Sequence, residues 1–158
     1  MKKLSLSLCI ILISILLFSC GNKAEPQSES FVQMGNPWTD HASLSDAEKA
    51  VDIRLGIPET IAGFTAQVFR TMNGELLEVI YKNGDSEVTV RKQAGENTDI
   101  SGDYTVYPSV NLTDMEGGSI EERTDGTVTS ALISFNGYSY SVYADSGIAA
   151  EFINAIIG

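Results

Sequence analysis

The chain has 158 residues, of which 43% are hydrophobic, and its 21 acidic side chains outnumber the 10 basic ones to give a net charge of −11. This hydrophobic content excludes a chain that is disordered by composition, and the length predicts a single domain with its own core. The acidic balance argues against binding to nucleic acid, because the phosphates would be repelled and no basic patch is visible in the sequence.

The first twenty residues have the pattern of an export signal. Lys2 and Lys3 precede an apolar run over residues 4–18, and Ser19 and Cys20 follow it. As a helix this run would span about 22 Å, which is less than the roughly 30 Å hydrocarbon core of a bilayer. A positive start, a short apolar run and a small residue at its end predict a signal peptide over residues 1–19 rather than a permanent membrane span.

The end of this signal, Leu17-Phe18-Ser19-Cys20 followed by Gly21, resembles the lipobox of bacterial lipoproteins. The resemblance implies that the thiol of Cys20 receives a diacylglyceryl group and that the chain is cut just before it. Two acyl chains give stable attachment, so we expect a protein anchored by lipid to the extracytoplasmic side of the cell membrane, with no other cofactor. The alternatives are an ordinary signal peptide with a stray cysteine, or an uncleaved anchor.

Processing at this position would leave no free thiol. Cys9 would be lost with the signal and Cys20 would carry lipid, which excludes disulfides, thiol nucleophiles and cysteine metal sites. The mature side chains would carry 8 positive and 21 negative charges, a net charge of −13. Such a charge favours solubility and repulsion from an anionic membrane surface.

A polar tether is predicted over residues 20–37, which contain Pro, Ser, Gly and Asn and show no hydrophobic period. We expect Trp38, directly after Pro37, to pack on the folded domain, because exposing a lone tryptophan is costly. Residues 38–158 are therefore predicted to form one domain.

The first predicted helix begins at two overlapping capping boxes, which pair Ser43 with Asp46 and Ser45 with Glu48. Apolar residues then recur on one stripe over residues 44–55, and the glycine and proline that follow are expected to end the helix. A helix of about eleven residues is too short to be stable alone, so it must pack on another element.

That element is predicted to be a sheet, because apolar stretches from Phe64 onwards alternate with turn signals that favour hairpins. The turn signals are Asn73-Gly74, Asn83-Gly84-Asp85, Asp125-Gly126 and Asn136-Gly137. The strands are expected near residues 64–72, 75–82, 86–92, 104–112, 118–123, 127–135 and 138–144. The polar residues 93–102 predict a longer loop.

A final helix is predicted after Ser146, where apolar residues recur at helical spacing from Ile148 to Ile157. An N-terminal and a C-terminal helix on one face of an antiparallel meander of about six or seven strands make an α+β domain. This is the fold class that the sequence predicts.

Several short motifs occur in order along residues 36–157. They are Asn36-Pro37-Trp38, Ser43-Leu44, Ile57-Pro58, Glu78-Val79-Ile80-Tyr81, Val90-Arg91-Lys92, Asp99-Ile100-Ser101-Gly102-Asp103-Tyr104 and Tyr138-Ser139-Tyr140-Ser141-Val142. Together they resemble a family of domains of uncharacterised function in lipoproteins and extracytoplasmic parts of membrane proteins of Gram-positive bacteria. The segment from Tyr107 to Arg123 departs from that pattern. The resemblance implies an exported domain of no established activity, and it contributes no catalytic residue.

Catalytic groups find little support in the sequence. His41 lies beside Asp40 and two residues before Ser43, but neighbours ahead of a helix cap cannot converge as a catalytic triad must. Adjacent acids such as Glu121 and Glu122 point to opposite faces of a strand, which excludes them as a glycosidase pair.

A second acidic pair, Asp114 and Glu116, has the right parity for such a pair, but with 21 acids some spaced pairs are inevitable. We therefore predict that the protein is not an enzyme, and a hydrolase built on carboxylates is the least favoured hypothesis.

A weak calcium hypothesis rests on Glu96, Asp99 and Asp103 around Gly102, with Asp114 and Glu116 as a second cluster. Neither cluster has EF-hand spacing, and Asp and Asn beside glycine ordinarily bond to their own backbone in turns. No metal site is therefore predicted with any specificity.

Tyr138 and Tyr140 share one face of the last predicted strand, whereas Tyr143 has the opposite parity. Two interpretations are open for the pair. It either packs in the core, which the sequence favours, or faces solvent as a rigid partner surface for peptides or glycans.

The leading functional hypothesis is a lipid-anchored binding module for an envelope protein, peptide or glycan. The alternative is a carrier or sensor of an apolar ligand held under a helical lid, by analogy of fold alone. An apolar cavity under the terminal helix would favour the carrier, and an exposed aromatic patch would favour partner binding.

Overall fold

The computed structural model describes residues 36–158, so the predicted signal peptide, Cys20 and the tether up to residue 35 lie outside the described residues. The elements are β1 (Trp38–His41), α2 (Leu44–Val51), β2 (Thr60–Ile61), β3 (Phe64–Met72), β4 (Leu76–Asn83), β5 (Ser86–Ala94), β6 (Ser109–Met115), β7 (Gly118–Thr124), β8 (Val128–Phe135), β9 (Tyr138–Asp145) and α3 (Ser146–Ile157). Within this part of the chain, neither helix has the length and apolar character needed to cross a membrane.

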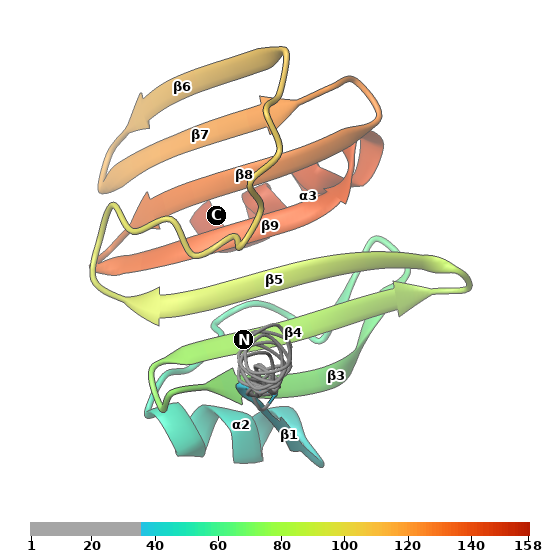
Figure 1. The fold of residues 1–158 in the computed structure, drawn as a ribbon, viewed down its shortest axis with the longest axis vertical. Helices are drawn as coiled ribbons and strands as arrows, with labels where there is room; N and C mark the ends of the chain where they lie inside the picture. The colour runs from blue at the N-terminus through green and yellow to red at the C-terminus, as the bar shows by residue number, and fades with distance from the viewer. Residues whose placement is uncertain (1–35) are drawn as a thin grey trace, which may run out of the picture. The chain divides into compact units, whose positions relative to one another are not determined.

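All strands belong to one antiparallel sheet with the order β1-β3-β4-β5-β9-β8-β7-β6, and β2 pairs with β3 beside β1. The sheet therefore consists of two meanders, β3–β5 and β6–β9. They meet where β9, the last strand in the chain, pairs with β5. To reach β6 the chain must cross from β5 to the far edge, and Figure 1 shows residues 95–108 running across β9, β8 and β7. We call these residues the crossing segment.

The predicted α+β class, with a helix near each end of the domain packed on a meander-like sheet, is confirmed. The turn chemistry also behaves as expected: both residues of Asn73-Gly74 and of Asn136-Gly137 have positive φ angles. Two strands were not predicted, because β1 has four residues and β2 only two, too few to show a period of two.

The strand predicted over residues 104–112 was wrong in its first half, since β6 begins at Ser109. The reason lies in local hydrogen bonds. The carboxylate of Asp99 accepts from the N–H of Ser101 at 3.0 Å, and that of Asp103 accepts from the N–H of Thr105 at 3.0 Å. Such turns offer the backbone an alternative to a ladder and keep the crossing segment irregular.

The first helix is shorter than predicted and ends at Val51. Ser43 caps its start as expected, accepting from the N–H of Asp46 at 3.2 Å. The second capping box was wrong, because the carboxylate of Glu48 accepts from the N–H of Leu55 at 2.8 Å instead. Asp52 adopts a left-handed conformation, and the extended chain beyond it buries alternate apolar residues as far as Ile57.

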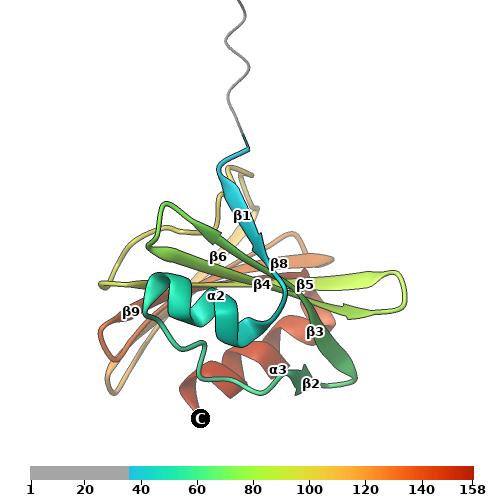
Figure 2. The same ribbon diagram turned by 90° about the horizontal axis from the view of Figure 1, so that it is seen from below.

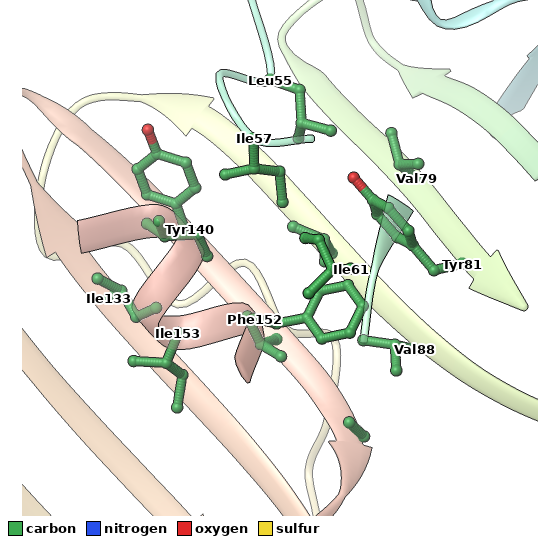
Figure 3. Packing of buried hydrophobic residues seen from close by; sticks show 14 of the residues in the cluster. Leu55, Ile57, Ile61, Val79, Tyr81, Val88, Ile133, Tyr140, Phe152 and Ile153 are labelled. Atoms are coloured by element: carbon green, nitrogen blue, oxygen red, sulfur yellow. The ribbon is translucent and has the colours of Figure 1, made fainter. Parts of the chain in front are cut away.

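Both helices pack on the same face of the sheet, as Figure 2 shows. The core between them is centred on Phe152 of α3, whose ring meets Tyr81 at 5.0 Å and Phe64 at 6.1 Å in edge-to-face geometry. The hydroxyl of Tyr81 donates to the carbonyl of Pro58 at 3.0 Å, and burial, followed by the nearby Glu59, raises its pKa. Figure 3 shows the rings of Phe152 and Tyr81 among aliphatic side chains such as those of Ile61 and Val88.

One lysine is buried on this face. Lys92 is 6% exposed, and its ammonium group donates to the carbonyls of Arg54 at 2.7 Å and Leu55 at 3.3 Å. The same group lies 4.2 Å from the ring of Tyr138 and 4.8 Å from that of Tyr140. Burial lowers its pKa, against the opposing effect of the Glu48 charge. These contacts tie the connection after α2 to the sheet.

Candidate binding groove

The opposite, helix-free face of the sheet carries a hollow of about 370 Å³ between the crossing segment and strands β6 to β8. We call it the groove. Its lining includes Leu112 and Leu132 as apolar groups and Asp99, Asp114 and Arg123 as charged ones. The pairing register explains this set, because alternate residues of β6, β7 and β8 point to the helix-free face.

The crossing segment is held to the sheet by serines of β8 and β9. The Ser134 hydroxyl accepts from the N–H of Asn97 at 3.3 Å, and the Ser139 hydroxyl accepts from the N–H of Thr98 at 3.1 Å. Ser139 also donates to the carbonyl of Gly95 at 2.9 Å. The crossing segment is not a strand, so these bonds satisfy its backbone groups in place of strand-to-strand hydrogen bonds. They also fix one wall of the groove.

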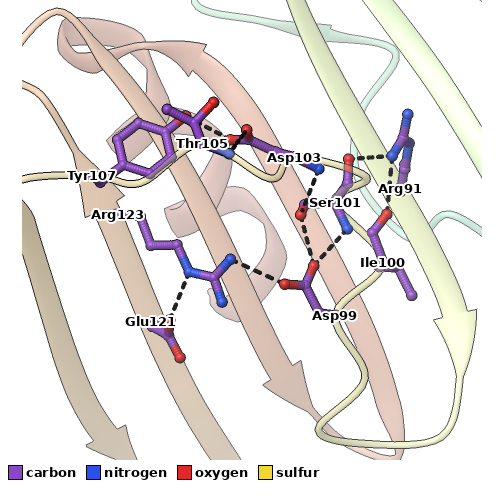
Figure 4. A network of polar contacts seen from close by, with 9 residues as sticks. All are labelled: Arg91, Asp99, Ile100, Ser101, Asp103, Thr105, Tyr107, Glu121 and Arg123. Atoms are coloured by element: carbon purple, nitrogen blue, oxygen red, sulfur yellow. Dashed lines mark hydrogen bonds and ion pairs between the residues drawn. The ribbon is translucent and has the colours of Figure 1, made fainter.

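Arg123 of β7 forms the charged centre of the groove (Figure 4). Its guanidinium donates to Glu121 at 2.7 Å and to Asp99 of the crossing segment at 3.0 Å. Burial alone would raise the pKa of Asp99, but hydrogen bonds from Ser101 and Arg123 lower it. The hydrogen bond to Glu121 raises the pKa of Arg123, so Arg123 and Asp99 form an ionised pair at neutral pH.

Further along the crossing segment, the hydroxyl of Tyr107 donates to Asp103 at 2.5 Å. Burial would raise the pKa of Asp103, yet hydrogen bonds from Tyr107 and Thr105 lower it to about 2. Burial and the bond to Asp103 raise the pKa of Tyr107 to about 12. Asp103 therefore stays charged and fixes a turn near the groove.

Exposed apolar side chains gather at this end of the molecule. On β6, Val110 is 60% exposed and Leu112 is 65% exposed, and both point to the helix-free face. Tyr104 and Val106 of the crossing segment are more than 90% exposed, and Tyr143 of β9 is 45% exposed. Within residues 36–158 these five are the exposed large hydrophobic side chains.

The same face is closed near β1. Glu78 of β4 is 1% exposed and accepts hydrogen bonds from Arg70 and Arg91 of the neighbouring strands, each at 2.7 Å from the guanidinium Nε. The ring of Trp38 lies 5.1 Å from the Arg70 guanidinium and 5.4 Å from that of Arg91. Trp38 thus packs on the domain, as expected, by covering this ion cluster.

A second hollow, of about 430 Å³, lies on the helix-covered face beside the end of α2. Val51, Ile53, Gln93 and Tyr138 are among its lining residues. Its walls are formed by the end of α2, two loops and strands β5 and β9. Within residues 36–158 no ion pair spans this second hollow.

The two tyrosines left open by the sequence take the packed arrangement. Tyr140 is 7% exposed and belongs to the core, and Tyr138 is half-buried, with its ring 6.4 Å from that of Tyr140. The interpretation of the pair as a solvent-facing platform does not fit Tyr140, because that side of β9 is the side covered by α3. Of the two, Tyr138 alone lines a hollow.

The residues of the calcium hypothesis do not converge. Asp99 bonds to Arg123 and Asp103 to Tyr107, while Glu96 accepts from the N–H of Gly137 at 2.9 Å. Among residues 36–158 there is no group of three His, Cys, Asp or Glu side chains placed to hold a metal ion.

The remaining candidate groups lie as follows. His41 bonds through Nε2 to the hydroxyl of Thr71 at 2.8 Å, on the face that α2 covers. Glu121 and Glu122 occupy opposite faces of β7, as the parity argument predicted. Asp114 lies on β6 and lines the groove, whereas Glu116 lies in the turn between β6 and β7.

Sequence reasoning missed the groove because its residues are spread over the crossing segment and four strands, and none of them belongs to a recognisable motif. A partial signal was present: Val110 and Leu112 alternate with polar residues in a segment expected to be a strand. Their alternation with polar residues does not determine which face of the sheet they occupy. The crossing segment, which completes the groove, is placed by the strand order alone.

Comparison of the chain with protein-family models, curated proteins and solved structures found no match.

Proposed function

We propose that residues 36–158 form the binding module of a lipoprotein, anchored through Cys20 on the extracytoplasmic side of the cell membrane, and that the groove contacts a protein partner. The observation that carries this proposal is a hollow with charged walls that the exposed Leu112 lines, on a face of the sheet where Val110 of the same strand is also exposed. Single apolar residues on a surface need no explanation, but a cluster rimmed by polar groups is typical of an interaction site.

The chemistry of the groove supports a binding role. Leu112 and Leu132 offer apolar contact, and the ionised pair of Arg123 with Asp99 offers charge-assisted hydrogen bonds. A general acid would need a carboxyl group with a raised pKa, whereas the pKa values of Asp99 and Asp103 are both lowered. This supports recognition rather than acid–base catalysis.

The carrier hypothesis receives no such support. An apolar ligand under the helices would need space between them and the sheet, but Phe152 of α3 is fully buried against Tyr81 and Phe64. Of the two hollows described above, one lies on the helix-free face and the other beside the end of α2, and both have mixed polar and apolar lining.

The anchoring part of the proposal is tested by Cys20→Ala. A diacylglyceryl group cannot form without the thiol, so we expect the variant to leave the membrane fraction and to appear in the soluble fraction or the medium. Ser19→Ala, which keeps a small residue before the cysteine, is the matched control and should stay in the membrane fraction. Membrane retention of Cys20→Ala would contradict the lipid anchor.

The binding part is tested by photo-crosslinking in intact cells that produce the full chain. A photoreactive residue at Val110 or Leu112 should give the same discrete protein adduct, identified by mass spectrometry. The same residue at Asp85, which is exposed in the turn between β4 and β5, should give none. Glycan-only adducts would replace the protein partner by a glycan, and absence of adducts at both groove positions would contradict the proposal.

A further inference from the structure

Strand β6 leaves one edge of the sheet unpaired. It is the last strand in the order, it pairs with β7 alone, and its seven residues run from Ser109 to Met115. In an antiparallel ladder every second residue directs its N–H and C=O away from its neighbour, so β6 presents a row of backbone donors and acceptors to solvent. Figure 1 shows no element beyond β6 at this edge among the described residues.

Natural proteins usually protect such edges, and the opposite edge of this sheet is protected. β1 has only four residues, and β2 occupies another part of the same edge of β3 with two residues. In contrast, β6 is a continuous strand of seven residues, and six of them are exposed. The long unpaired edge therefore coincides with the exposed apolar residues Val110 and Leu112.

We propose that β6 is extended by a strand from the partner: an extended peptide segment that alternates apolar residues with Lys or Arg. This inference rests on the proposed function. Strand addition gives affinity through main-chain hydrogen bonds and specificity through alternate side chains. Alternate side chains of an added strand would lie on the helix-free face beside Val110, Leu112 and Asp114, which lead into the groove.

The charge around the β6 edge determines which sign of charge the partner segment must carry. The hairpin of residues 109–124 carries Asp114, Glu116, Glu121 and Glu122 against a single cation, Arg123. That guanidinium already bonds to Glu121 and to Asp99. Backbone edges attract any extended chain, so the excess of carboxylates selects segments that carry positive charge and repels acidic ones, including a second copy of this chain.

The experiment uses an end-capped eight-residue peptide of alternating Lys and Val, added to the protein at physiological ionic strength, with amide hydrogen exchange as the readout. Strand addition should slow exchange at least tenfold at those residues of 109–115 whose N–H groups point away from β7, and leave residues 38–41 unchanged. An otherwise identical peptide with N-methyl groups on alternate residues should not bind, because it lacks the donors. A Glu–Val peptide should bind at least tenfold more weakly.

Two variants separate this edge from a general effect of charge. Leu112→Lys should weaken binding of the Lys–Val peptide at least tenfold, because it removes an apolar contact and adds charge repulsion. Thr60→Lys, exposed at the other edge of the sheet, makes a similar change of charge and should have no effect. Equal effects of the two variants, or protection that falls outside β6, would overturn the proposal.

Failure of this inference is distinguishable from failure of the proposed function. A crosslinked protein at Leu112 together with no protection of β6 by the peptide would leave the groove as a binding site and remove strand addition. Protection of residues 109–115 that appears without peptide and rises with protein concentration would show self-pairing through β6 instead. Sedimentation at the same concentrations would report the dimer.

Discussion

Each end of the sheet carries a cluster of arginine and carboxylate side chains, and the two clusters differ in their exposure to solvent. Near β1, the carboxylate of Glu78 is buried between two arginines and covered by Trp38. Near β6, the cluster of Arg123 with Glu121 and Asp99 remains partly exposed beside a hollow. An ion pair without solvent contributes to a fixed structure, whereas one at a rim can exchange its partners for those of a ligand. The closed end therefore fits a structural role, and the open end is the one where we propose binding.

The strongest test of this comparison removes one carboxylate from each end. Glu78→Ala leaves two arginines without their shared partner, and we expect a loss of about 3–5 kcal/mol in the free energy of unfolding. Glu121→Ala should cost less than about 1 kcal/mol, because its ion pair is solvent-exposed. Urea denaturation of both variants measures the difference. Equal losses would mean that the two clusters do not differ in the way described.

Acid should weaken the turn of the crossing segment that Asp103 fixes. The pKa of Asp103 is about 2, below its value in an unfolded chain, so its charged form favours the folded state. That contribution is complete above about pH 4 and is lost as the pH falls towards 2. The urea midpoints of the wild type and Asp103→Asn should therefore differ at pH 5–7 and converge near pH 2.

A control for the acid experiment is Asp85→Asn, which changes an exposed carboxylate in a turn of the closed half. Its midpoint should follow that of the wild type throughout this range. A pH-independent difference between the wild type and Asp103→Asn would show that Asp103 acts through its shape rather than through its charge.

Substitution of Leu112 should have the smallest effect on stability and the largest effect on binding. Leu112→Ala removes an exposed side chain and should change the free energy of unfolding by no more than about 0.5 kcal/mol. The same variant should reduce capture of the protein found by crosslinking from Val110. A large loss of stability would place Leu112 in the folded core rather than on a binding surface.

Local signals in the sequence account for much of the fold. Turn dipeptides such as Asn73-Gly74 and Asn136-Gly137 set the strand ends to within one or two residues, because their backbone preferences act without help from the rest of the chain. The error at the end of the first helix came from longer-range packing. Asp52 ended the first helix early because Ile53 and Leu55 gain more by alternating into the core than by continuing the helix.

Composition and hydrophobic period by themselves determined the α+β class, the two helices and the capping role of Ser43, because each depends on residues close together in the chain. Tertiary structure alone decided that β9 lies beside β5, which sends the crossing segment over the helix-free face and leaves β6 at an edge. The groove, the burial of Glu78 and the exposure of Leu112 all follow from that pairing. The physical reason is that strand order depends on contacts between residues far apart in sequence, and alternation along one strand cannot specify its neighbour.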